Sequence, residues 1–508
     1  MSWSSSFINS LSSPSKSVEY ALRFIGYSND YFIGSAKTIR NSGMINIGSA
    51  EVVIDNARIT PQIWSVNFGG FSIQINGDLR PLDTSAFRKG AIAELHMRRD
   101  RKFPELIAIG QLRSLSGGRG VWNLEFGGLI SALTSRLSTK KNELSFFYNA
   151  GKTALVTTNF NYSSDTRLYL SDITIFERDT NYYGLISVTD SSGVSANYKW
   201  STKTTTIAPA GYLQITHTLV WPSMTDLKVL AINDVVVSVA RLNGRPDFIF
   251  NRMLMSTGNA TQGPFDDYPK SWGAGINFDP SLINSQSMSY YYDAWKTTSG
   301  SFEVQLLFSE PATSGIRSVI NSFLSMGMFP VLCQGRIEWR VAQDPANAFR
   351  IDAKITDKDI YSIESHQIYS TSQPVVFGKS SILTSTAGGT KNTSSRETSN
   401  VRGLPAKNEN LRDHRYLYRI DSPAQSAKAT VDLGRLNVWD LNTYEELVIS
   451  CSERFAGLAA GDIVAITSSY IYGFNEGSGK SYLSKRAMIL GIRWRPSASR
   501  CIITLGIV

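Results

Sequence analysis

The chain has 508 residues, of which 42% are hydrophobic and 11% aromatic. This apolar content excludes a wholly disordered chain, and the length predicts about three or four domains. Only 18% of the residues are charged and the net charge is +9, a mild excess for this length. A nucleic-acid-binding protein would concentrate such an excess in a stripe, and none is evident.

The start of the chain, MSWSSSFINSLSSPSK, lacks the basic segment and apolar core of a secretory signal. No run of about 18 apolar residues occurs, so no membrane span is expected. The low charge and the many Ser, Thr, Asn and Gly residues are common in β-rich extracellular and virion proteins. Without a signal, such a protein would leave its cell by lysis, as virion parts do.

Alternating apolar residues predict β-strands through the first half of the chain. In QIWSVNFGGFSIQING the alternation on both sides of Gly69 and Gly70 predicts a hairpin. Segments 120–128 and 182–200 repeat the alternation, and the second predicts a strand pair with a turn between its halves. Many strands with short turns favour barrels or sandwiches over a parallel α/β sheet.

The densest basic cluster, RRDRK at Arg98 to Lys102, lies between two strand-like runs. We interpret it as an exposed hairpin tip, with a phosphate-binding patch as the alternative.

The second half adds two helices and a polar segment. Pro246, Asp247 and Gly258 suit the start and end of a helix over 247–256. The spacing in SGIRSVINSFLSMG predicts a second helix, which runs into FPVLCQGRIEWRV, a hairpin turning at Gln334 and Gly335. The segment 375–410 is rich in Ser, Thr, Gly and Asn and predicts a long loop or a linker.

Residue types that carry chemistry are scattered. The three cysteines predict buried reduced thiols, since their spacing suits neither a disulfide framework nor a metal site. The four histidines share no metal or triad spacing and are interpreted as structural. TDKD, from Thr356 to Asp359, places two carboxylates close together but lacks the glycine and distal glutamate of a calcium loop, so we expect a solvated turn. The cysteines are Cys333, Cys451 and Cys501, and the histidines are His96, His217, His366 and His414.

One stretch, FNEGSGKSYL at 474–483, is similar to a nucleotide-binding loop. A P-loop would need glycine at position 474, where the chain has Phe474; Gly473 is one place too early. After Ser481, the residues from Met488 to Trp494 alternate as in a strand, whereas a P-loop is followed by a helix. The stretch is therefore predicted to be a glycine-rich hairpin tip, and ATP binding at Lys480 is not expected.

Several segments resemble the hub proteins at the tip or baseplate of tailed-phage tails. LAAGDIVAITSSYIYGF with KRAMILGIRWRPSASRCIITLGIV resembles the closing β-domain of those hubs, which begins with a GD-V strand. SFLSMGMFPVLCQGRIEWRVAQDP resembles their helix and hairpin, with Gly335, Ile337 and Arg340 in a G-x-I/L-x-x-R pattern. NGRPDFIFNRMLMSTGN with GPFDDYPKSWGAGI resembles a hub helix and the following loop, and FPELIAIGQLRSLSGGRGVWNLEFGG is similar to strand pairs of tail-tube-like barrels.

The resemblance implies a mainly β, multidomain fold: tail-tube-like β-barrels with a few short helices, plus small β or α+β domains. It implies a homotrimer whose paired barrels present a pseudo-sixfold ring to the hexameric tail tube. The implied partners are the tail tube or distal tail protein, the central spike or fibre, and the tape measure protein. The implied place is the tail tip of the virion, after synthesis in the host cytoplasm. No stable nucleic-acid complex is expected, although the genome would pass through the lumen.

We predict no enzyme and no catalytic, cofactor-binding or metal-binding residue. The alternatives are a receptor- or carbohydrate-binding tail protein, whose Tyr and Trp residues could stack on sugars, and a cell-wall hydrolase, whose carboxylate pair would have to be assembled by folding. The predicted domains are a tail-tube-like β-barrel region (1–205), a second hub domain with helix 247–256 (206–300), a helix-hairpin segment completing a second tube-like barrel (301–372), a polar loop or linker (373–412) and a small C-terminal β-domain (413–508).

Overall fold

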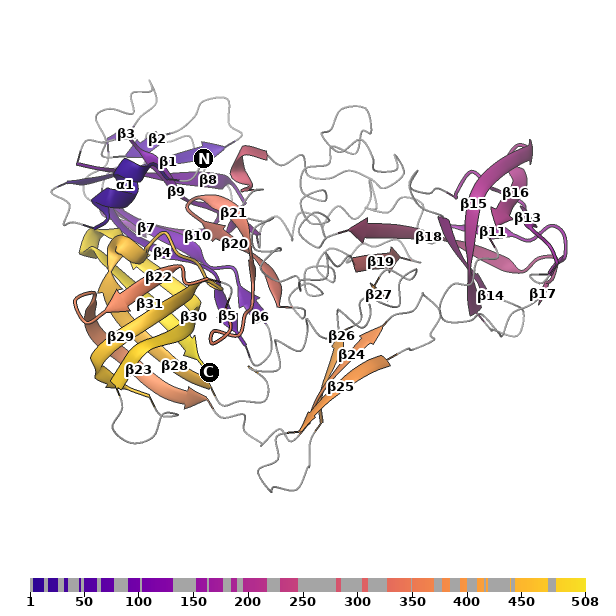
Figure 1. The fold of residues 1–508 in the computed structure, drawn as a ribbon. Coiled ribbons are helices and arrows are strands. Elements are labelled where there is room, and N and C mark those ends of the chain that lie inside the picture. The colour runs from indigo at the N-terminus through magenta and orange to yellow at the C-terminus, as the bar shows by residue number, and fades with distance from the viewer. Residues whose placement is uncertain are drawn as a thin grey trace.

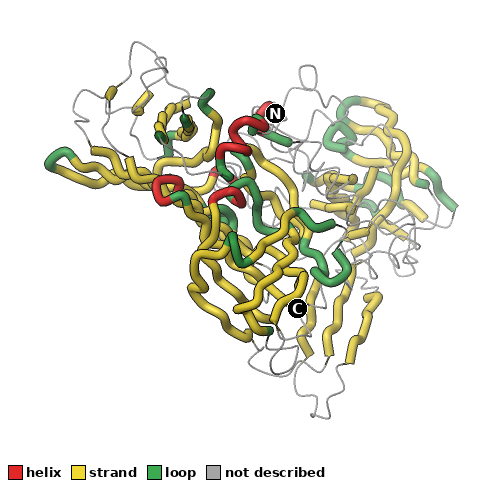
Figure 2. Tube along the Cα trace, turned by 60° about the vertical axis from the view of Figure 1, so that its left-hand side comes forward, coloured by secondary structure: helices red, strands yellow, loops and turns green. Residues whose placement is uncertain are grey.

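The structure is a computed structural model, and strands make up most of the part that it describes (Figure 2). That part comprises residues 3–12, 17–25, 32–34, 45–46, 50–61, 65–76, 90–100, 103–130, 152–161, 164–176, 184–189, 195–216, 229–244, 280–284, 304–308, 327–348, 350–369, 377–383, 393–399, 409–414, 417–418, 439, 444–473 and 481–508. The predicted mainly β fold class is confirmed.

The largest unit is a 14-stranded sheet built from both ends of the chain (Figure 1). Its N-terminal strands are β1 (Val18–Ile25), β2 (Phe32–Gly34), β3 (Ile45–Asn46), β4 (Ala50–Asp55), β7 (Gly70–Asn76), β8 (Ile92–Arg99), β9 (Glu105–Gly118) and β10 (Val121–Gly128). Its C-terminal strands are β22 (Ala353–Thr356), β23 (Ile360–Tyr369), β28 (Tyr444–Ser452), β29 (Ile463–Tyr472), β30 (Ser481–Arg495) and β31 (Arg500–Ile507). The two groups are joined where β4 pairs with β30.

One hydrophobic core lies against this sheet and draws residues from both groups of strands. On β7 and β10 the apolar side chains of every second residue point inward, and the rings of Phe71 and Phe126 stack with centroids 4.3 Å apart. The predicted strand over segment 120–128 is confirmed. The strand predicted after Ser481 is also confirmed as β30, but residues 487–492 are all buried because both faces of this part of the strand are covered.

A second sheet of eight strands lies apart from the first (Figure 1). Its strands are β11 (Thr153–Leu155), β13 (Arg167–Leu170), β14 (Gly184–Thr189), β15 (Ser195–Ile207), β16 (Ala210–Ile215), β18 (Val235–Gly244), β19 (Val304–Phe308) and β27 (Leu417–Tyr418). The predicted strand pair in segment 182–200 is confirmed as β14 and β15. The division expected at residue 205 falls inside β15, and the helix expected at 247–256 lies outside the described residues. The domain division stays a prediction.

The predicted hairpin at Gln334 and Gly335 is confirmed. It consists of β20 (Met328–Cys333) and β21 (Arg336–Val341), which pair antiparallel along their whole length. Gln334 and Gly335 have φ angles of 50° and 72°, as a type I′ turn requires at both central positions. The helix expected before this hairpin lies outside the described residues, apart from its closing Gly327.

The hairpin predicted at Gly69 and Gly70 is wrong in its pairing. The strand before the turn, β6 (Ser65–Asn67), pairs with β5 (Arg58–Thr60) in a small separate sheet. The strand after it, β7, has β4 and β10 on its two edges, so no edge remains for β6. Gly69 has a φ of +63°, and an added Cβ would lie 2.0 Å from the carbonyl oxygen of Asp55. The glycine turn therefore redirects the chain from one sheet to another.

The polar segment 373–412 also differs from the expected loop or linker. Two strands of a small sheet lie within it, β24 (Phe377–Leu383) and β25 (Thr393–Ser399), and a third, β26 (Glu409–His414), begins in it and ends just beyond. Seven consecutive register pairs join β24 to β25, from Phe377–Ser399 to Leu383–Thr393. Backbone pairing needs no apolar side chains, so a Ser- and Thr-rich segment can form strands where composition predicts a loop.

The remaining described elements are short. They are β12 (Phe160–Asn161) and β17 (Val229–Leu230), the helix α1 (Ser5–Ser10), and the 3-10 turns η2 (Pro280–Leu282), η4 (Glu453–Phe455) and η5 (Pro496–Ala498). None of the helices in the described ranges has the length and apolar content needed to cross a membrane.

Candidate functional site

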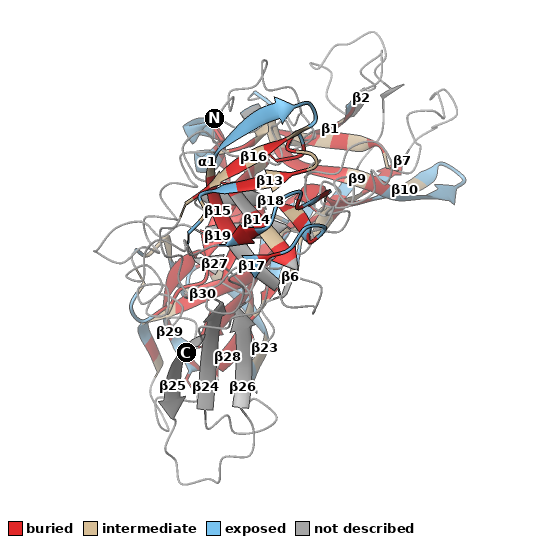
Figure 3. Cartoon of the chain, turned by 90° about the vertical axis from the view of Figure 1, so that its right-hand side faces the viewer, coloured by how far each residue is buried: buried red, intermediate tan, exposed pale blue. Residues whose placement is uncertain are grey.

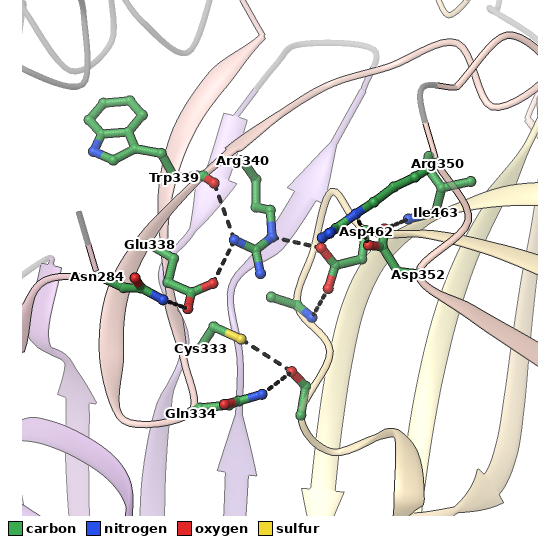
Figure 4. A network of polar contacts seen from close by, with 12 residues as sticks. Asn284, Cys333, Gln334, Glu338, Trp339, Arg340, Arg350, Asp352, Asp462 and Ile463 are labelled. Carbon is green, nitrogen blue, oxygen red and sulfur yellow. Dashed lines mark hydrogen bonds and ion pairs between the residues drawn. The ribbon is translucent and has the colours of Figure 1, made fainter. Parts of the chain in front are cut away.

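The hairpin β20–β21 carries Arg340 into a buried polar network beside the C-terminal strands (Figure 4). Its side chain is only 3% exposed. Nε donates to Oδ1 of Asp462 at 2.7 Å, and Nη1 lies 2.7 Å from Oε2 of Glu338. Nη1 also donates to the carbonyl oxygen of Trp339 at 3.2 Å. The planar guanidinium thus meets two carboxylates from different segments, a geometry that lysine could not reproduce.

Asp462 is fixed at the start of β29 by its own contacts. Oδ2 accepts a hydrogen bond from the amide of Ala459 at 2.9 Å. The preceding Gly461 has a φ of +94°, and an added Cβ there would lie 2.8 Å from Cβ of Arg340. Gly461 therefore serves two purposes: it adopts the left-handed backbone and leaves space for the arginine.

A third carboxylate, that of Asp352, lies next to Asp462. Oδ2 of Asp352 accepts the amide hydrogen of Ile463 at 2.8 Å, and its Oδ1 pairs with Arg350. Burial raises the pKa of Asp352, and the negative charge of Asp462 raises it further. Asn284 completes the cluster by donating to Oε1 of Glu338 at 2.7 Å.

The turn of the same hairpin contacts the N-terminal half of the large sheet. An added Cβ at Gly335 would lie 2.7 Å from the carbonyl oxygen of Leu106 in β9. Nε1 of Trp3 donates to that same carbonyl oxygen at 2.8 Å, and the amide of Trp3 donates to Oε1 of Gln334 at 3.3 Å. Sγ of Cys333 donates to the carbonyl oxygen of Gly457 at 3.2 Å. One hairpin therefore bridges the N-terminal and C-terminal parts of the fold.

A buried ion pair gives the two halves another connection. Nη1 of Arg99, at the end of β8, lies 2.6 Å from Oε1 of Glu453 in η4, and both side chains are almost fully buried. Arg98 pairs with Glu19 on the neighbouring strand β1. The interpretation of RRDRK as an exposed tip is therefore wrong for these two arginines, because each has a carboxylate partner in the fold. Arg101 and Lys102 lie outside the described residues.

The two histidines whose side chains are described, His96 and His366, each pair with a different glutamate. Nε2 of His96 lies 3.0 Å from Oε2 of Glu94, and Nε2 of His366 lies 3.1 Å from Oε2 of Glu445. The hydroxyl of Tyr482 also donates to Glu445, but Glu445 and Tyr482 are each 1% exposed, so no substrate reaches them. The side chains of His217 and His414 lie outside the described part. In the described ranges no three His, Cys, Asp or Glu side chains are grouped to hold a metal ion.

The other predicted residues have structural surroundings. All three cysteines are buried and free, as expected; Cys451 and Cys501 are register partners on β28 and β31. TDKD is a turn, but the solvated description is wrong for Asp359, which is 7% exposed and pairs with Arg454 at 2.8 Å. Ser481 begins strand β30 where a P-loop would continue into a helix. Residues 474–480 lie outside the described part.

No protein-family model matches the chain, and no curated protein matches its sequence. Among solved structures, the tail protein from Neisseria meningitidis MC58 is similar over 96% of this chain and 96% of its own, with 10% identity and a TM-score of 0.35. The 43 kDa tail protein of prophage MuSo2 from Shewanella oneidensis is similar over 96% of this chain and 98% of its own, with 8% identity and a TM-score of 0.38. A chain from the virion of a native gene transfer agent particle covers 46% of this chain, with 10% identity and a TM-score of 0.20.

Proposed function

We propose that the protein is a structural part of a phage tail and acts as the hub of the tail tip or baseplate. The observation that carries the proposal is the buried pair of Arg340 and Asp462. Arg340 ends the G-x-I/L-x-x-R pattern and Asp462 belongs to the GD-V strand, the two patterns whose sequences resemble the hub family. Two patterns that meet in one buried contact are better explained by a common scaffold than by separate coincidences.

The proposed mechanism is geometric. The hub forms a trimer that joins the hexameric tail tube to the central spike or fibre and encloses the end of the tape measure protein. The buried network suits this role because ion pairs between segments fix their relative orientation, whereas apolar contacts alone tolerate sliding. A ring that matches the symmetry of its neighbours needs such fixed orientation.

The proposal is tested by the oligomeric state and the assembly of the purified full chain. Sedimentation analysis is expected to give a trimer, and electron microscopy a threefold ring with a central channel. Mixed with the tail tube protein of the same phage, the ring is expected to cap the tube end. A strictly monomeric protein at high concentration that also leaves tube ends uncapped contradicts the proposal.

A receptor- or carbohydrate-binding tail protein is the second candidate, because tyrosines are exposed on the C-terminal strands. Tyr361 on β23 is 54% exposed, and Tyr470 and Tyr472 on β29 are 75% and 54% exposed. Exposed rings of this kind stack on sugars. If the isolated chain binds host cells or glycans and Tyr470→Ala loses that binding, this candidate is favoured. If the parent protein binds no glycan, this candidate is rejected.

A further inference from the structure

The large sheet is hollowed on the face opposite its hydrophobic core, where β4 meets β30. An open pocket of about 610 Å³ lies there, and strands from both halves line it. Beneath the pocket, β4 pairs with β30 through two pairs of facing residues, Asp55 with Arg493 and Ile54 with Trp494. Because side chains alternate along strands, the residues flanking core positions point into the pocket, among them Ser72, Val448 and Thr504.

Three arginines line this pocket, and two of them have acidic partners. Nε of Arg493 lies 2.5 Å from Oδ1 of Asp55, and Nη2 of Arg58 lies 3.3 Å from Oε1 of Glu446. Both arginine side chains remain more than half exposed at 51% and 57%, so their remaining N–H groups face solvent.

Arg113 is the third arginine, and within the described part of the chain it takes part in no ion pair. On β9 it directly follows the buried Leu112 and is the first of six exposed residues at the end of the strand. Figure 3 shows this exposed end of the β9–β10 hairpin. An added Cβ at Gly127 would lie 2.0 Å from Nε of Arg113 and 2.4 Å from its Cζ. The guanidinium therefore lies against the bare backbone of Gly127, which holds the cation over the pocket instead of leaving it to extend into solvent.

The wall formed by C-terminal strands is less polar. Val448 on β28 and Ile502 on β31 are half-buried there, close to the exposed cations. We infer that this pocket binds an acidic polypeptide segment that also carries an aliphatic side chain: the arginines bind its carboxylates and the C-terminal wall takes its apolar group. Arg113 supplies the unneutralised charge, since Arg58 and Arg493 already have partners.

The pocket suits a peptide better than a polyphosphate. Its lining includes Asp55 and Glu125, and these would repel a chain that carries a negative charge on every unit. A peptide can place its carboxylates beside the arginines and its neutral groups beside Asp55 and Glu125. The inference rests on these contacts alone and does not depend on the proposed tail function.

The test is fluorescence anisotropy on the full chain with a labelled short peptide of repeating Glu-Glu-Ile. We expect the parent protein to bind it and Arg113→Gln to weaken binding by roughly tenfold or more, the loss expected for charged hydrogen bonds. Arg119→Gln is the matched control, because Arg119 is exposed on the same hairpin and lies outside the pocket lining. This control is expected to bind as tightly as the parent.

Further arms separate the alternatives. Gly127→Ala retains the charge of Arg113 but displaces its guanidinium, so it is expected to weaken binding as well, with circular dichroism to verify the fold. A Lys-Lys-Ile peptide is expected not to bind. Equal peptide affinity in the parent and Arg113→Gln proteins overturns the inference. Tighter binding of an oligothymidylate of the same length than of the Glu-Glu-Ile peptide overturns it too.

Discussion

Replacing Arg340 by methionine tests whether the buried network orients the hairpin β20–β21. Methionine keeps an unbranched apolar stem and removes the guanidinium with its charge. The change leaves Asp462 and Glu338, which are 3% and 10% exposed, without their shared cation. Arg336→Met is the matched control, because Arg336 lies on the same strand but is only half-buried.

The expected cost follows from this burial. Breaking a buried ion pair by removing one partner costs about 3–5 kcal/mol, because an uncompensated charge stays in the interior. A substitution at a half-buried site without such a feature stays within about 0.5 kcal/mol. Asp462→Asn preserves an acceptor for Ala459 but removes the charge, so the double variant is expected to cost less than the sum of the single variants by roughly 0.5–3 kcal/mol.

Native-state hydrogen exchange with mass spectrometry is the appropriate assay, since a multidomain chain does not unfold in one two-state step. Peptides covering the strands β20 and β21 are expected to lose protection by roughly 100- to 4,000-fold in Arg340→Met, because each 1.4 kcal/mol is a factor of ten. Peptides from the eight-stranded sheet serve as internal references. The reasoning is refuted if Arg340→Met exchanges no faster than Arg336→Met, or if the two charge deletions add within about 0.3 kcal/mol.

Three other predictions concern the same fold. Gly461→Ala is expected to destabilise by about 1–3 kcal/mol, because an L-residue is strained at φ +94° and its Cβ would contact Arg340; an unchanged melting temperature contradicts this. The pKa of Asp352 in the folded state is raised above the ordinary value of 3.8, so the folded protein holds this proton more tightly than the unfolded chain does. The protonated carboxyl therefore stabilises the fold at low pH, and this contribution is lost as the pH rises through the folded-state pKa. Asp352→Asn is expected to flatten that decline in a series of melting temperatures from acidic to neutral pH, and an identical slope in both proteins would reject the assignment. Burial raises the pKa of all three thiols, so N-ethylmaleimide is expected to leave them unlabelled in the native protein and to label them in urea, as measured by intact mass; native labelling of Cys333, Cys451 or Cys501 would count against the buried sites.

Local structure was predictable from sequence wherever short-range chemistry decides it. The turn at Gln334 and Gly335 forms where those residues permit left-handed backbone, and β10 and β30 are strands as their apolar patterns indicated. The predictions that failed concern which strands pair with one another. Gly69 and Gly70 looked like a hairpin turn, yet β7 pairs with β4 and β10, a choice that depends on which edges other strands leave open.

The same limit explains what could be foreseen of the candidate site. Arg340 and Asp462 both lie in patterns singled out by the sequence, but they are 122 residues apart and no local rule pairs them. The buried ion pair of Arg99 and Glu453 could not be predicted, because charged residues are rarely buried. A basic cluster at a predicted turn indicates a solvated surface unless a buried acid is known to face it. An available signal was Gly461 immediately before an aspartate at a strand start, where glycine often marks close approach of another segment.

The pairing of β4 with β30 has a consequence for how the protein forms. Nε of Arg493 contacts Asp55 across 438 residues of chain, and the last strand, β31, lies between β28 and β30 in the interior of the sheet. The large sheet therefore cannot close until nearly the whole chain has been synthesised, whereas most strands of the eight-stranded sheet lie within residues 153–244 and pair locally. The middle of the chain can fold first, and the junction built by Arg340, Asp462, Arg99 and Glu453 then joins the two ends. Removing the final strand β31 should consequently expose the core of the N-terminal half as well as that of the C-terminal half, because both pack into one hydrophobic cluster.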